Sequence, residues 1–253
     1  MRFVTFNALH GLHPGDPGPD PDAWPFAVAS LQADVLALQE VDRRQVRSGG
    51  VDMTAVAAQA ADLPHWRFAP VMLGRPGRWR DAGPDDDAAA PAHGIALLSR
   101  YPVSSWTTIA LPGGPRRTWV RSPDHLLPRV RRDRPRCALV ARVASPAGDL
   151  TVVATHLTPL RGQNVAQLRA LVDACAALPR PLVVLGDLNL GPATARSVTG
   201  WSAAATAGTF PADDPHAQVD HVLVDGPLRA DGAQARATGL SDHRALVVDL
   251  TRT

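Results

Sequence analysis

The sequence predicts a layered α/β domain that contains at least two β-sheets. Short, β-branched apolar runs bounded by glycine, proline or aspartate recur along the chain, which is typical of buried strands. Three longer stretches repeat their apolar residues at helical spacing instead. The chain has 253 residues, of which 45% are apolar and 20% charged, so it is long enough to bury a substantial core. We therefore expect a single domain over residues 1–253.

Nine segments are predicted to be strands because each is a short apolar run that ends at a polar or turn-forming residue. In chain order they are Arg2–Asn7, Val35–Gln39, Gly94–Ser99, Val103–Leu111, Cys137–Val143, Leu150–Thr155, Leu182–Gly186, Val219–Val224 and Arg244–Leu250. A Pro-Ala-Gly-Asp turn joins the fifth strand to the sixth, which predicts an antiparallel hairpin.

Three segments are predicted to be helices: Asp22–Ala33, about Asp52–Leu63 and Gln163–Leu178. The third is the clearest because its apolar residues share one face, and Pro179 and Pro181 end it. Two further segments, 74–92 and 112–135, are rich in glycine, proline, aspartate or arginine and predict irregular structure. Loops of this length in a single domain are usually functional or disordered.

Composition excludes several classes of protein. A net charge of +2 is too small to indicate a surface that coats nucleic acid. No apolar run approaches the roughly 18 residues of a membrane span, and the first residues lack a cleavable signal. Cys137 and Cys175 both stand in apolar surroundings, which predicts buried free thiols and a cytoplasmic protein. Every basic residue other than histidine is arginine, so a cationic contact to phosphate would use a guanidinium.

Polar residues stand where several of the predicted strands end. Asp187 and Asn189 follow a strand whose last residue, Gly186, permits a tight turn. The carboxylate could orient or deprotonate a water molecule while the amide donates to a phosphoryl oxygen. An ordinary Asp/Asn turn after a strand is the structural alternative. Asp242 and His243 pair a carboxylate with an imidazole that could act as a donor or a base, or form a plain surface loop.

Glu40 is the only glutamate of the chain, and it ends a strongly apolar run. Together with Asn7 it offers hard oxygen ligands, which suit Mg²⁺ because that ion takes only one or two protein carboxylates and keeps several waters. Standing alone, a glutamate at the end of a strand would be interpreted as a solvated charge.

Taken together and in order, these residues resemble the endonuclease/exonuclease/phosphatase superfamily. Seven motifs carry the resemblance: Thr5-Phe6-Asn7, Leu38-Gln39-Glu40, the segment from Gly94 to Pro102, Thr155-His156-Leu157, Gly186-Asp187-Leu188-Asn189, Val219-Asp220-His221 and Ser241-Asp242-His243. Each is weak singly, but the ordered set spans nearly the whole chain. The resemblance implies the deoxyribonuclease-I-like fold, a four-layer α/β-sandwich in which two packed mixed sheets are flanked by helices.

The resemblance also implies a role for each polar residue. Glu40, with Asn7 beside it, would bind Mg²⁺ or Mn²⁺. Asp187 would position the attacking water, and Asn189 would hold that water or a phosphate oxygen. His243, oriented by Asp242, would contact the scissile phosphate. Asp220 would steady the histidines or a metal-bound water, and His156 would donate toward the phosphate or the leaving oxygen.

Departures from relatives of known activity bear on the substrate. The chain has Asn7-Ala8-Leu9-His10-Gly11 where exonuclease III and AP endonuclease relatives carry a different sequence, which argues against DNA repair. It is more similar here to bacterial members near the sphingomyelinases and inositol phosphatases. Deoxyribonuclease I pairs a second glutamate with the histidine that matches His156. Here His93 is a candidate for a comparable place, although a structural histidine is the simpler interpretation, and His10 is a similar candidate.

An arginine-rich segment between Arg116 and Arg136 has two interpretations: a solvated loop, or a flap that grips phosphate through Arg131, Arg132 and Arg136. Few aromatic residues lie nearby to stack on bases, so nucleic acid is not favoured as the partner. We expect a monomeric, metal-dependent phosphoesterase that acts on a small phosphorylated metabolite or a lipid headgroup. A nuclease, and a non-catalytic binding module on the same fold, are the alternatives.

Overall fold

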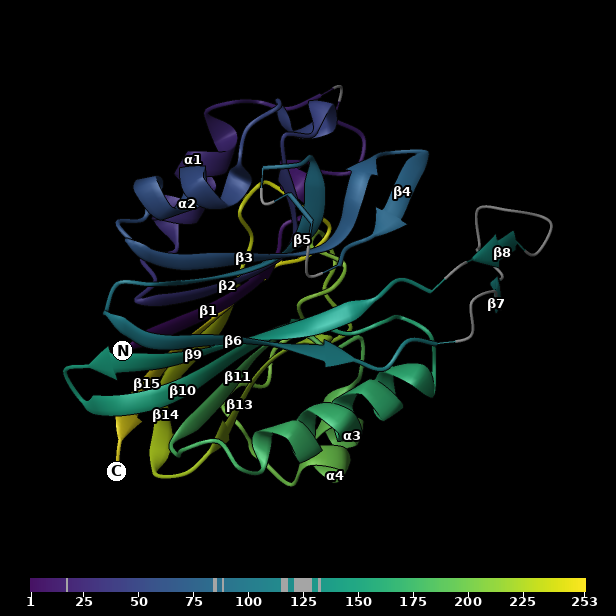
Figure 1. The fold of residues 1–253 in the computed structure, drawn as a ribbon. Helices are drawn as coiled ribbons and strands as arrows, with labels where there is room; N and C mark the ends of the chain where they lie inside the picture. Colours follow the sequence, from purple (N-terminus) through teal and green to yellow (C-terminus); the bar gives the residue numbers. More distant parts are fainter. Residues whose placement is uncertain (17, 84–85, 88, 115–117, 121–128, 132) are drawn as a thin grey trace.

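Two β-sheets pack face to face, and a pair of helices covers the outer face of each (Figure 1). This computed structural model describes residues 1–16, 18–83, 86–87, 89–114, 118–120, 129–131 and 133–253, with 118–120 and 129–131 described as backbone only. The order of layers is helices, seven-stranded sheet, six-stranded sheet, helices. The four-layer α/β-sandwich expected from the resemblance is therefore confirmed.

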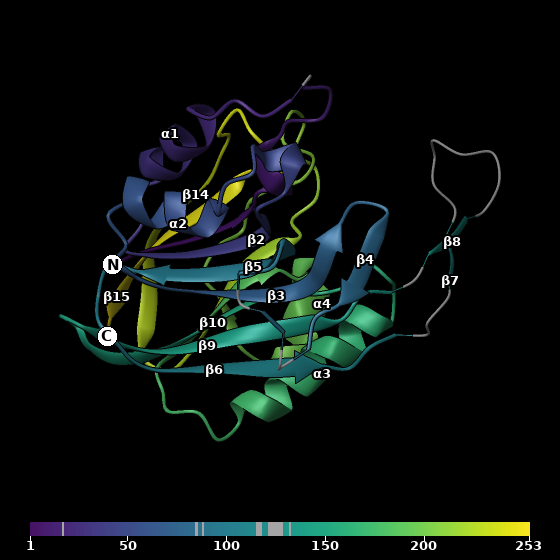
Figure 2. The same cartoon turned by 45° about the horizontal axis from the view of Figure 1, so that its top comes forward.

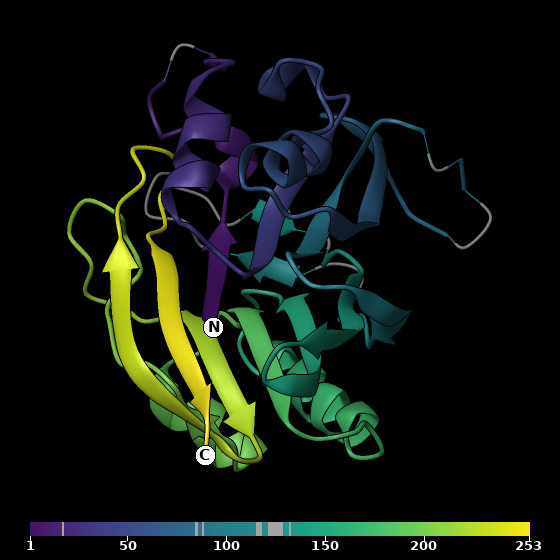
Figure 3. The ribbon, with the colours of Figure 1, turned by 90° about the vertical axis from the view of Figure 1, so that its left-hand side faces the viewer.

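The seven-stranded sheet has the order β14-β15-β1-β2-β5-β3-β4. Its strands are β1 (Arg2–Asn7), β2 (Val35–Arg43), β3 (His65–Arg75), β4 (Arg78–Asp81), β5 (Ala92–Ser99), β14 (Leu228–Arg236) and β15 (Ala245–Arg252). β1 lies inside the sheet, parallel to β2 and antiparallel to β15. Figure 3 shows the yellow C-terminal strand beside the purple N-terminal strand.

The six-stranded sheet has the order β12-β13-β11-β10-β9-β6. Its strands are β6 (Val103–Leu111), β9 (Arg136–Ser145), β10 (Gly148–His156), β11 (Leu182–Asp187), β12 (Ser202–Ala203) and β13 (Asp220–Asp225). β9 and β10 form the predicted hairpin, and β10 is parallel to β11. A separate antiparallel pair, β7 (Thr118–Val120) and β8 (Arg129–Arg131), lies away from both sheets at the end opposite the termini (Figure 2).

The helices are α1 (Ala23–Ser30), α2 (Met53–Ala60), α3 (Gln163–Cys175) and α4 (Pro192–Thr199), with 3₁₀ turns η1 (Leu9–Gly11) and η2 (Val46–Ser48). α2 begins at Asp52, whose carboxylate accepts the backbone N–H groups of Thr54 and Ala55. α4 begins with Pro192, which needs no N–H partner at that position, and ends at Gly200 in the left-handed conformation. None of the helices among the described residues combines the length and apolar character of a membrane span.

Three buried apolar clusters hold the four layers together. The first lies between the sheets and includes Leu97 from β5 and Val183 from β11. The second joins the seven-stranded sheet to α1 and α2 through residues such as Trp24. The third joins the six-stranded sheet to α3 and α4, with Leu168 and Leu171 at its centre. Both free cysteines are buried, as the sequence predicted.

Among the described residues, seven strands and α-helices lie where the sequence predicted no regular structure: β3, β4, β7, β8, β12, β14 and α4. β4 falls within the segment 74–92, and the backbone of β7 and β8 falls within 112–135. β3 was missed because a proline interrupts its pattern; the strand accommodates Pro70 at a register shift against β5. β14 and α4 were also missed, since β14 is largely exposed at a sheet edge and α4 is only two turns long.

Candidate active site

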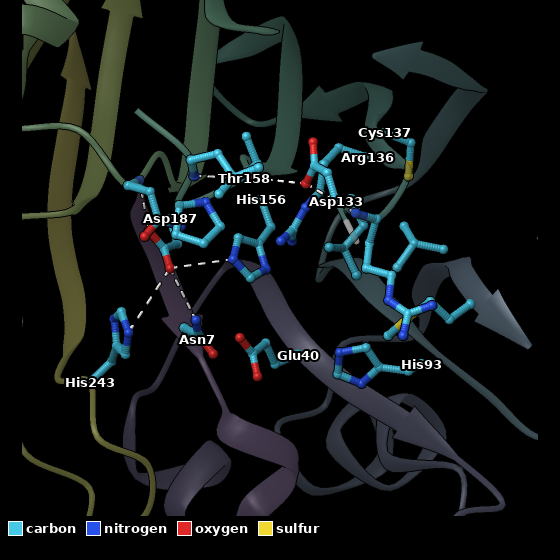
Figure 4. A pocket seen from close by; sticks show the side chains of 18 residues that line it. Asn7, Glu40, His93, Asp133, Arg136, Cys137, His156, Thr158, Asp187 and His243 are labelled. Atoms are coloured by element: carbon cyan, nitrogen blue, oxygen red, sulfur yellow. Dashed lines mark hydrogen bonds and ion pairs between the residues drawn. The ribbon is translucent and has the colours of Figure 1, made fainter. Parts of the chain in front are cut away.

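A cleft of about 720 Å³ opens where β1, β2, β10 and β11 end (Figure 4). Because β1 is parallel to β2 and β10 to β11, each sheet delivers two neighbouring strand ends to this place. Of the residues singled out in the sequence, Asn7, Glu40, His93, Arg136, His156, Asp187, Asn189 and His243 line the cleft.

Asp187 lies at the centre of the cleft's polar network and is almost fully buried. Its Oδ1 accepts the backbone N–H of Asn189 at 2.9 Å, and its Oδ2 accepts the side-chain amide of Asn7 at 3.1 Å. The second bond joins the last residue of β1 to the last residue of β11, so it ties one sheet to the other. Burial, and then the charge of Asp220, raise the pKa of Asp187 to about 7.

Two imidazoles flank the Asp187 carboxylate. Nε2 of His156 lies 3.5 Å from Oδ2 of Asp187, and Nε2 of His243 lies 3.9 Å from the same oxygen. Burial, helped by the charges of Arg136 and His243, holds the pKa of His156 well below its usual value, so this ring is neutral. Burial alone would lower the pKa of His243, but its bond to Asp220 and the surrounding carboxylates raise it to about 9.

Asp220, rather than Asp242, orients His243, which corrects the expectation from the sequence. Nδ1 of His243 lies 2.9 Å from Oδ2 of Asp220, a carboxylate that is completely buried at the start of β13. Asp242 is only partly buried, and its carboxylate accepts a long bond of 3.4 Å from Ser241. Asp242 and His243 lie in a bend just before β15, after Ser241 in the left-handed conformation, so their side chains do not share one partner.

Glu40 presents its carboxylate to the cleft from a bulge in β2. Between Leu38 and Val41 the register against β5 shifts, and Glu40 itself takes a left-handed backbone conformation with φ 55°. Its carboxylate makes no hydrogen bond or ion pair with any residue that the structure describes. Asn7 lies beside it in Figure 4, with Oδ1 accepting the backbone N–H of Leu9 at 3.3 Å.

Hydrogen bonds hold both the side chain and the backbone of Asn189. Its side-chain amide donates to the carbonyl of Leu157 at 3.0 Å, and its own carbonyl accepts from Asn164 on α3. One amide N–H and the side-chain oxygen are left to face the cleft. This arrangement fits a residue that holds a water or a phosphate oxygen.

Arg136 brings a positive charge to the cleft at the first residue of β9. Its Nε is buried without a hydrogen-bond partner among the described residues. Burial lowers the pKa of Arg136, while the nearby charges of Glu40 and Asp187 oppose that shift. A desolvated guanidinium with unused donors is a binding group for an anion.

The remaining candidates from the sequence lie elsewhere. His10 does not line the cleft: it faces a neighbouring groove of about 300 Å³ beside Trp24 and Met53, and burial lowers its pKa to about 4. Its role in substrate binding stays a prediction. Arg132 and the side chain of Arg131 lie outside the described residues.

Two carboxylates at or near the cleft were not predicted from the sequence, Asp133 and Asp42. Asp133 lines the cleft and accepts the hydroxyl of Thr158 at 2.8 Å. Asp42, two residues after Glu40, is completely buried and lies behind His93. The sequence prediction ended this strand at Gln39, whereas β2 continues to Arg43, so nothing in the prediction marked Asp42 as buried.

Carboxylates and imidazoles that could hold a cation are gathered at this end. Asp187, Asp220 and His243 each offer one ligand atom, all within 4.8 Å of one another. His243 and Asp220 are already bonded to each other, however, and Asp187 accepts two bonds. Glu40 is the carboxylate of the cleft that has no described partner, which makes it the more available ligand.

A two-sheet α/β-sandwich with histidines and carboxylates at its strand ends defines a deoxyribonuclease-I-like protein. The chain belongs to the Endonuclease/Exonuclease/phosphatase family, whose model matches residues 4–243. Members of this family generally hydrolyse phosphate esters and typically depend on divalent metals; they include phosphatases, phosphodiesterases and nucleases.

Solved structures share the fold. An endonuclease/exonuclease/phosphatase from Beutenbergia cavernae DSM 12333 matches with TM-score 0.70 and 20% identity over 99% of this chain and 71% of that one. The mannosyl-6-phosphatase Bt3783 of Bacteroides thetaiotaomicron VPI-5482 gives 0.61 and 14%, over 99% and 98%. The human Nocturnin catalytic domain with bound sulfate gives 0.62 and 18%, over 100% and 94%. A comparison with curated proteins found no match.

Proposed function

We propose that this protein is a divalent-metal-dependent phosphoesterase that hydrolyses a small phosphodiester or phosphomonoester by direct attack of water. One observation carries the proposal: a buried carboxylate, Asp187, lies between two imidazoles of opposite protonation preference. The same cleft holds the Glu40 carboxylate and the Nε of Arg136, neither of which has a hydrogen-bond partner among the described residues. These are the groups needed to generate a nucleophile and to stabilise charge that develops on phosphorus oxygens.

Asp187 is suited to take a proton from the attacking water. Its raised pKa, about 7, lies near neutral pH. A general base with such a pKa is deprotonated in much of the protein and still binds the proton of water strongly enough to remove it. Its two bonds from Asn7 and Asn189 fix the carboxylate, so that the water it accepts is held in one direction. Asn189 adds its remaining donor or acceptor to hold that water or a phosphate oxygen.

His243 is suited to donate to a phosphoryl oxygen. With a pKa of about 9 it is an imidazolium at neutral pH, and Asp220 fixes the ring through Nδ1, which leaves Nε2 on the cleft side. The neutral ring of His156 can donate one N–H toward the phosphate or the leaving oxygen. Arg136 would donate to another phosphate oxygen, and this bond would satisfy the buried Nε that has no partner among the described residues.

The donors at the cleft fit a divalent cation. Glu40 and Asn7 would hold it through oxygen atoms, the type of ligand that Mg²⁺ and Mn²⁺ prefer. Glu40 has no hydrogen-bond or ion-pair partner among the described residues, and Oδ1 of Asp220 is buried without one, so carboxylate oxygens remain available to a cation. When bound, the cation would neutralise phosphate charge and polarise the ester.

The lining of the cleft supports a small substrate. The described lining residues include no phenylalanine, tyrosine or tryptophan, so the cleft lacks the platforms on which single-stranded bases stack. One wall is apolar and includes Val71, Met72 and Ile95, which suits the carbon skeleton of a metabolite or headgroup. A structural neighbour bears the name mannosyl-6-phosphatase, so sugar phosphates belong among the compounds to test. The monomeric state and the cytoplasmic location stay predictions.

Conservative variants at the centre of the cleft test the proposal. Asp187→Asn and His243→Gln should each lower hydrolysis of bis(p-nitrophenyl) phosphate and p-nitrophenyl phosphate by about 10²–10⁴-fold in the presence of Mg²⁺ or Mn²⁺. Asp214→Asn and His216→Gln are matched controls, because both residues are exposed and outside the cleft; their rates should equal the wild-type rate. Circular dichroism checks that all four variants fold.

A panel of substrates then narrows the class. Sugar phosphates, inositol phosphates, phospholipid headgroups and both single-stranded and plasmid DNA should be compared at equal metal concentration. Turnover of a small ester without DNA cleavage is the expected result. Cleavage of DNA alone would establish the nuclease instead, and metal binding without turnover of any compound would indicate a binding module. Full activity of both cleft variants would refute the site.

A further inference from the structure

A second histidine–aspartate pair lies on the side of the cleft opposite His243. Nδ1 of His93 on β5 lies 2.7 Å from Oδ1 of Asp42 on β2, its partner in the strand register. Asp42 is completely buried and is held by Arg47, whose Nε and Nη2 donate to its two oxygens at 2.7 and 2.9 Å. The hydroxyl of Ser48 donates to it at 3.2 Å. The carboxylate thus has one fixed orientation.

This arrangement sets the tautomer of His93. A carboxylate only accepts, so the 2.7 Å contact requires a proton on Nδ1 of His93. Nη2 of Arg47 also lies 3.2 Å from Nδ1, and with a proton on that nitrogen it donates to Asp42 rather than to the ring. Arg47 already compensates the charge of Asp42, so the pair does not need a cationic ring. In the neutral ring Nε2 then carries a lone pair. No described residue bonds to that nitrogen, and His93 lines the cleft.

A purely structural role does not explain why Nε2 has no partner among the described residues in a ring that lines the cleft. Figure 4 shows the His93 ring beside Glu40, with Asn7 on the other side of that carboxylate. All three residues line the same cleft. The bulge in β2 brings Glu40 to this position, because it gives the strand an extra residue opposite β5 just before the pair Val41–Gly94.

We propose that His93 supplies a nitrogen ligand to the divalent cation held by Glu40, with Asp42 as the positioning residue that fixes the ring. The inference rests on the metal site of the proposed function. A histidine that binds a metal commonly donates its other N–H to a carboxylate, and this is the relation between His93 and Asp42. A lone pair on Nε2 would repel a phosphate oxygen, so a direct contact to the ester is the poorer interpretation.

The mixed ligand set has a consequence for metal choice. Mg²⁺ prefers oxygen ligands almost exclusively, whereas the divalent transition-metal ions, from Mn²⁺ onward, bind a nitrogen ligand more strongly than Mg²⁺ does. The site should therefore bind Mn²⁺ more tightly than Mg²⁺, and the difference should depend on His93.

Metal binding to the substrate-free protein tests the inference without reference to turnover. By isothermal titration calorimetry, His93→Ala should weaken Mn²⁺ binding about 10–100-fold while Mg²⁺ binding changes by less than about threefold. Pulsed electron paramagnetic resonance of the Mn²⁺ complex should show coupling to a nitrogen nucleus that His93→Ala removes. His156→Ala should keep that coupling. If His93→Ala does not fold, as judged by its thermal melt, His93→Gln replaces it.

Glu40→Ala distinguishes a failure of the metal site from a failure of the His93 ligand. Loss of Mn²⁺ binding in Glu40→Ala, together with unchanged affinity and nitrogen coupling in the folded His93 variant, would overturn the inference and leave the metal site intact. Unchanged Mn²⁺ binding in Glu40→Ala would refute the metal site itself. A nitrogen coupling that disappears in His156→Ala instead would place the ligand on the other wall of the cleft and also overturn the inference.

Discussion

His243 and Asp220 form a buried pair whose protonation the surrounding carboxylates control. The hydrogen bond between them is 2.9 Å long, and both side chains are nearly inaccessible to water. The pKa of His243, about 9 in the folded protein, lies above the value of 6.5 expected in the unfolded chain. Protonation of this ring therefore stabilises the fold fully below pH 6.5, and the contribution is lost as the pH rises toward 9.

We expect the metal-free protein to lose on the order of 3 kcal/mol of unfolding free energy from this pair between pH 6 and pH 10. Asp220→Asn removes the negative charge and should lower the pKa of His243, so its stability should change less over the same range. Urea unfolding at several pH values measures the stability, and the nuclear magnetic resonance signals of the ring measure the pKa. Equal pH dependence in both proteins would contradict the assignment.

The polar residues of the cleft were largely predictable from the sequence, but their pairing was not. Asn7, His156 and Asp187 are the last residues of their strands, and His243 lies just before β15. Glu40 lies in a bulge inside β2 but directly follows an apolar run, so apolar runs in the sequence locate all five residues. Which carboxylate contacts which imidazole depends on how β13 of one sheet packs against β15 of the other, and sequence order suggested the wrong neighbour for His243.

At the scale of elements, Gly186 shows how closely β10 and β11 approach at the site. A Cβ at this position would collide with the backbone carbonyl of Thr155 on the neighbouring strand, which is not free to move aside. The glycine therefore permits the parallel pairing that places His156 opposite Asp187.

Gly186→Ala should destabilise the protein by about 1–3 kcal/mol and lower activity further than this loss of stability explains, because Asp187 moves with the strand. Gly232→Ala is the matched control: this glycine also lies in a strand, and a Cβ there meets open space. Its stability should be unchanged or slightly higher. Chemical unfolding and the rate on an aryl phosphate measure both effects. Equal stability of the two variants would show that the strands can separate at little cost.

Strands and helices were predictable where the apolar residues follow one clear pattern. They were not predictable where backbone pairing with a neighbouring strand, rather than the side chains, determines the structure. β1, β6 and β11 follow apolar runs and match their predicted ranges within one residue. β14 has few β-branched residues, and it is a strand because its backbone pairs along the whole of β15. α4 carried its own signals, Pro192 at the start and Gly200 at the end, but it is too short for periodicity to show.

At the scale of the whole molecule, the active site depends on the two sheets keeping a fixed position relative to each other. β1 and β2 contribute Asn7 and Glu40, while β10 and β11 contribute His156 and Asp187. The bond between Asn7 and Asp187 crosses from one sheet to the other, and the apolar cluster between the sheets lies beneath it. Neither sheet can bury its inner face alone, so we expect the two to unfold together.

Leu97→Ala tests this cooperativity, because Leu97 projects from the seven-stranded sheet into the cluster between the sheets. Removing its side chain should cost about 2–5 kcal/mol. If the sandwich unfolds as one unit, native-state hydrogen exchange should become faster by the same factor in both sheets. The amides of β11 should then lose as much protection as those of β2. Val183→Ala makes the reciprocal change from the six-stranded sheet. A loss of protection confined to the mutated sheet in each variant would show two separately folding halves, and the cleft between them would then be an interface rather than the edge of one domain.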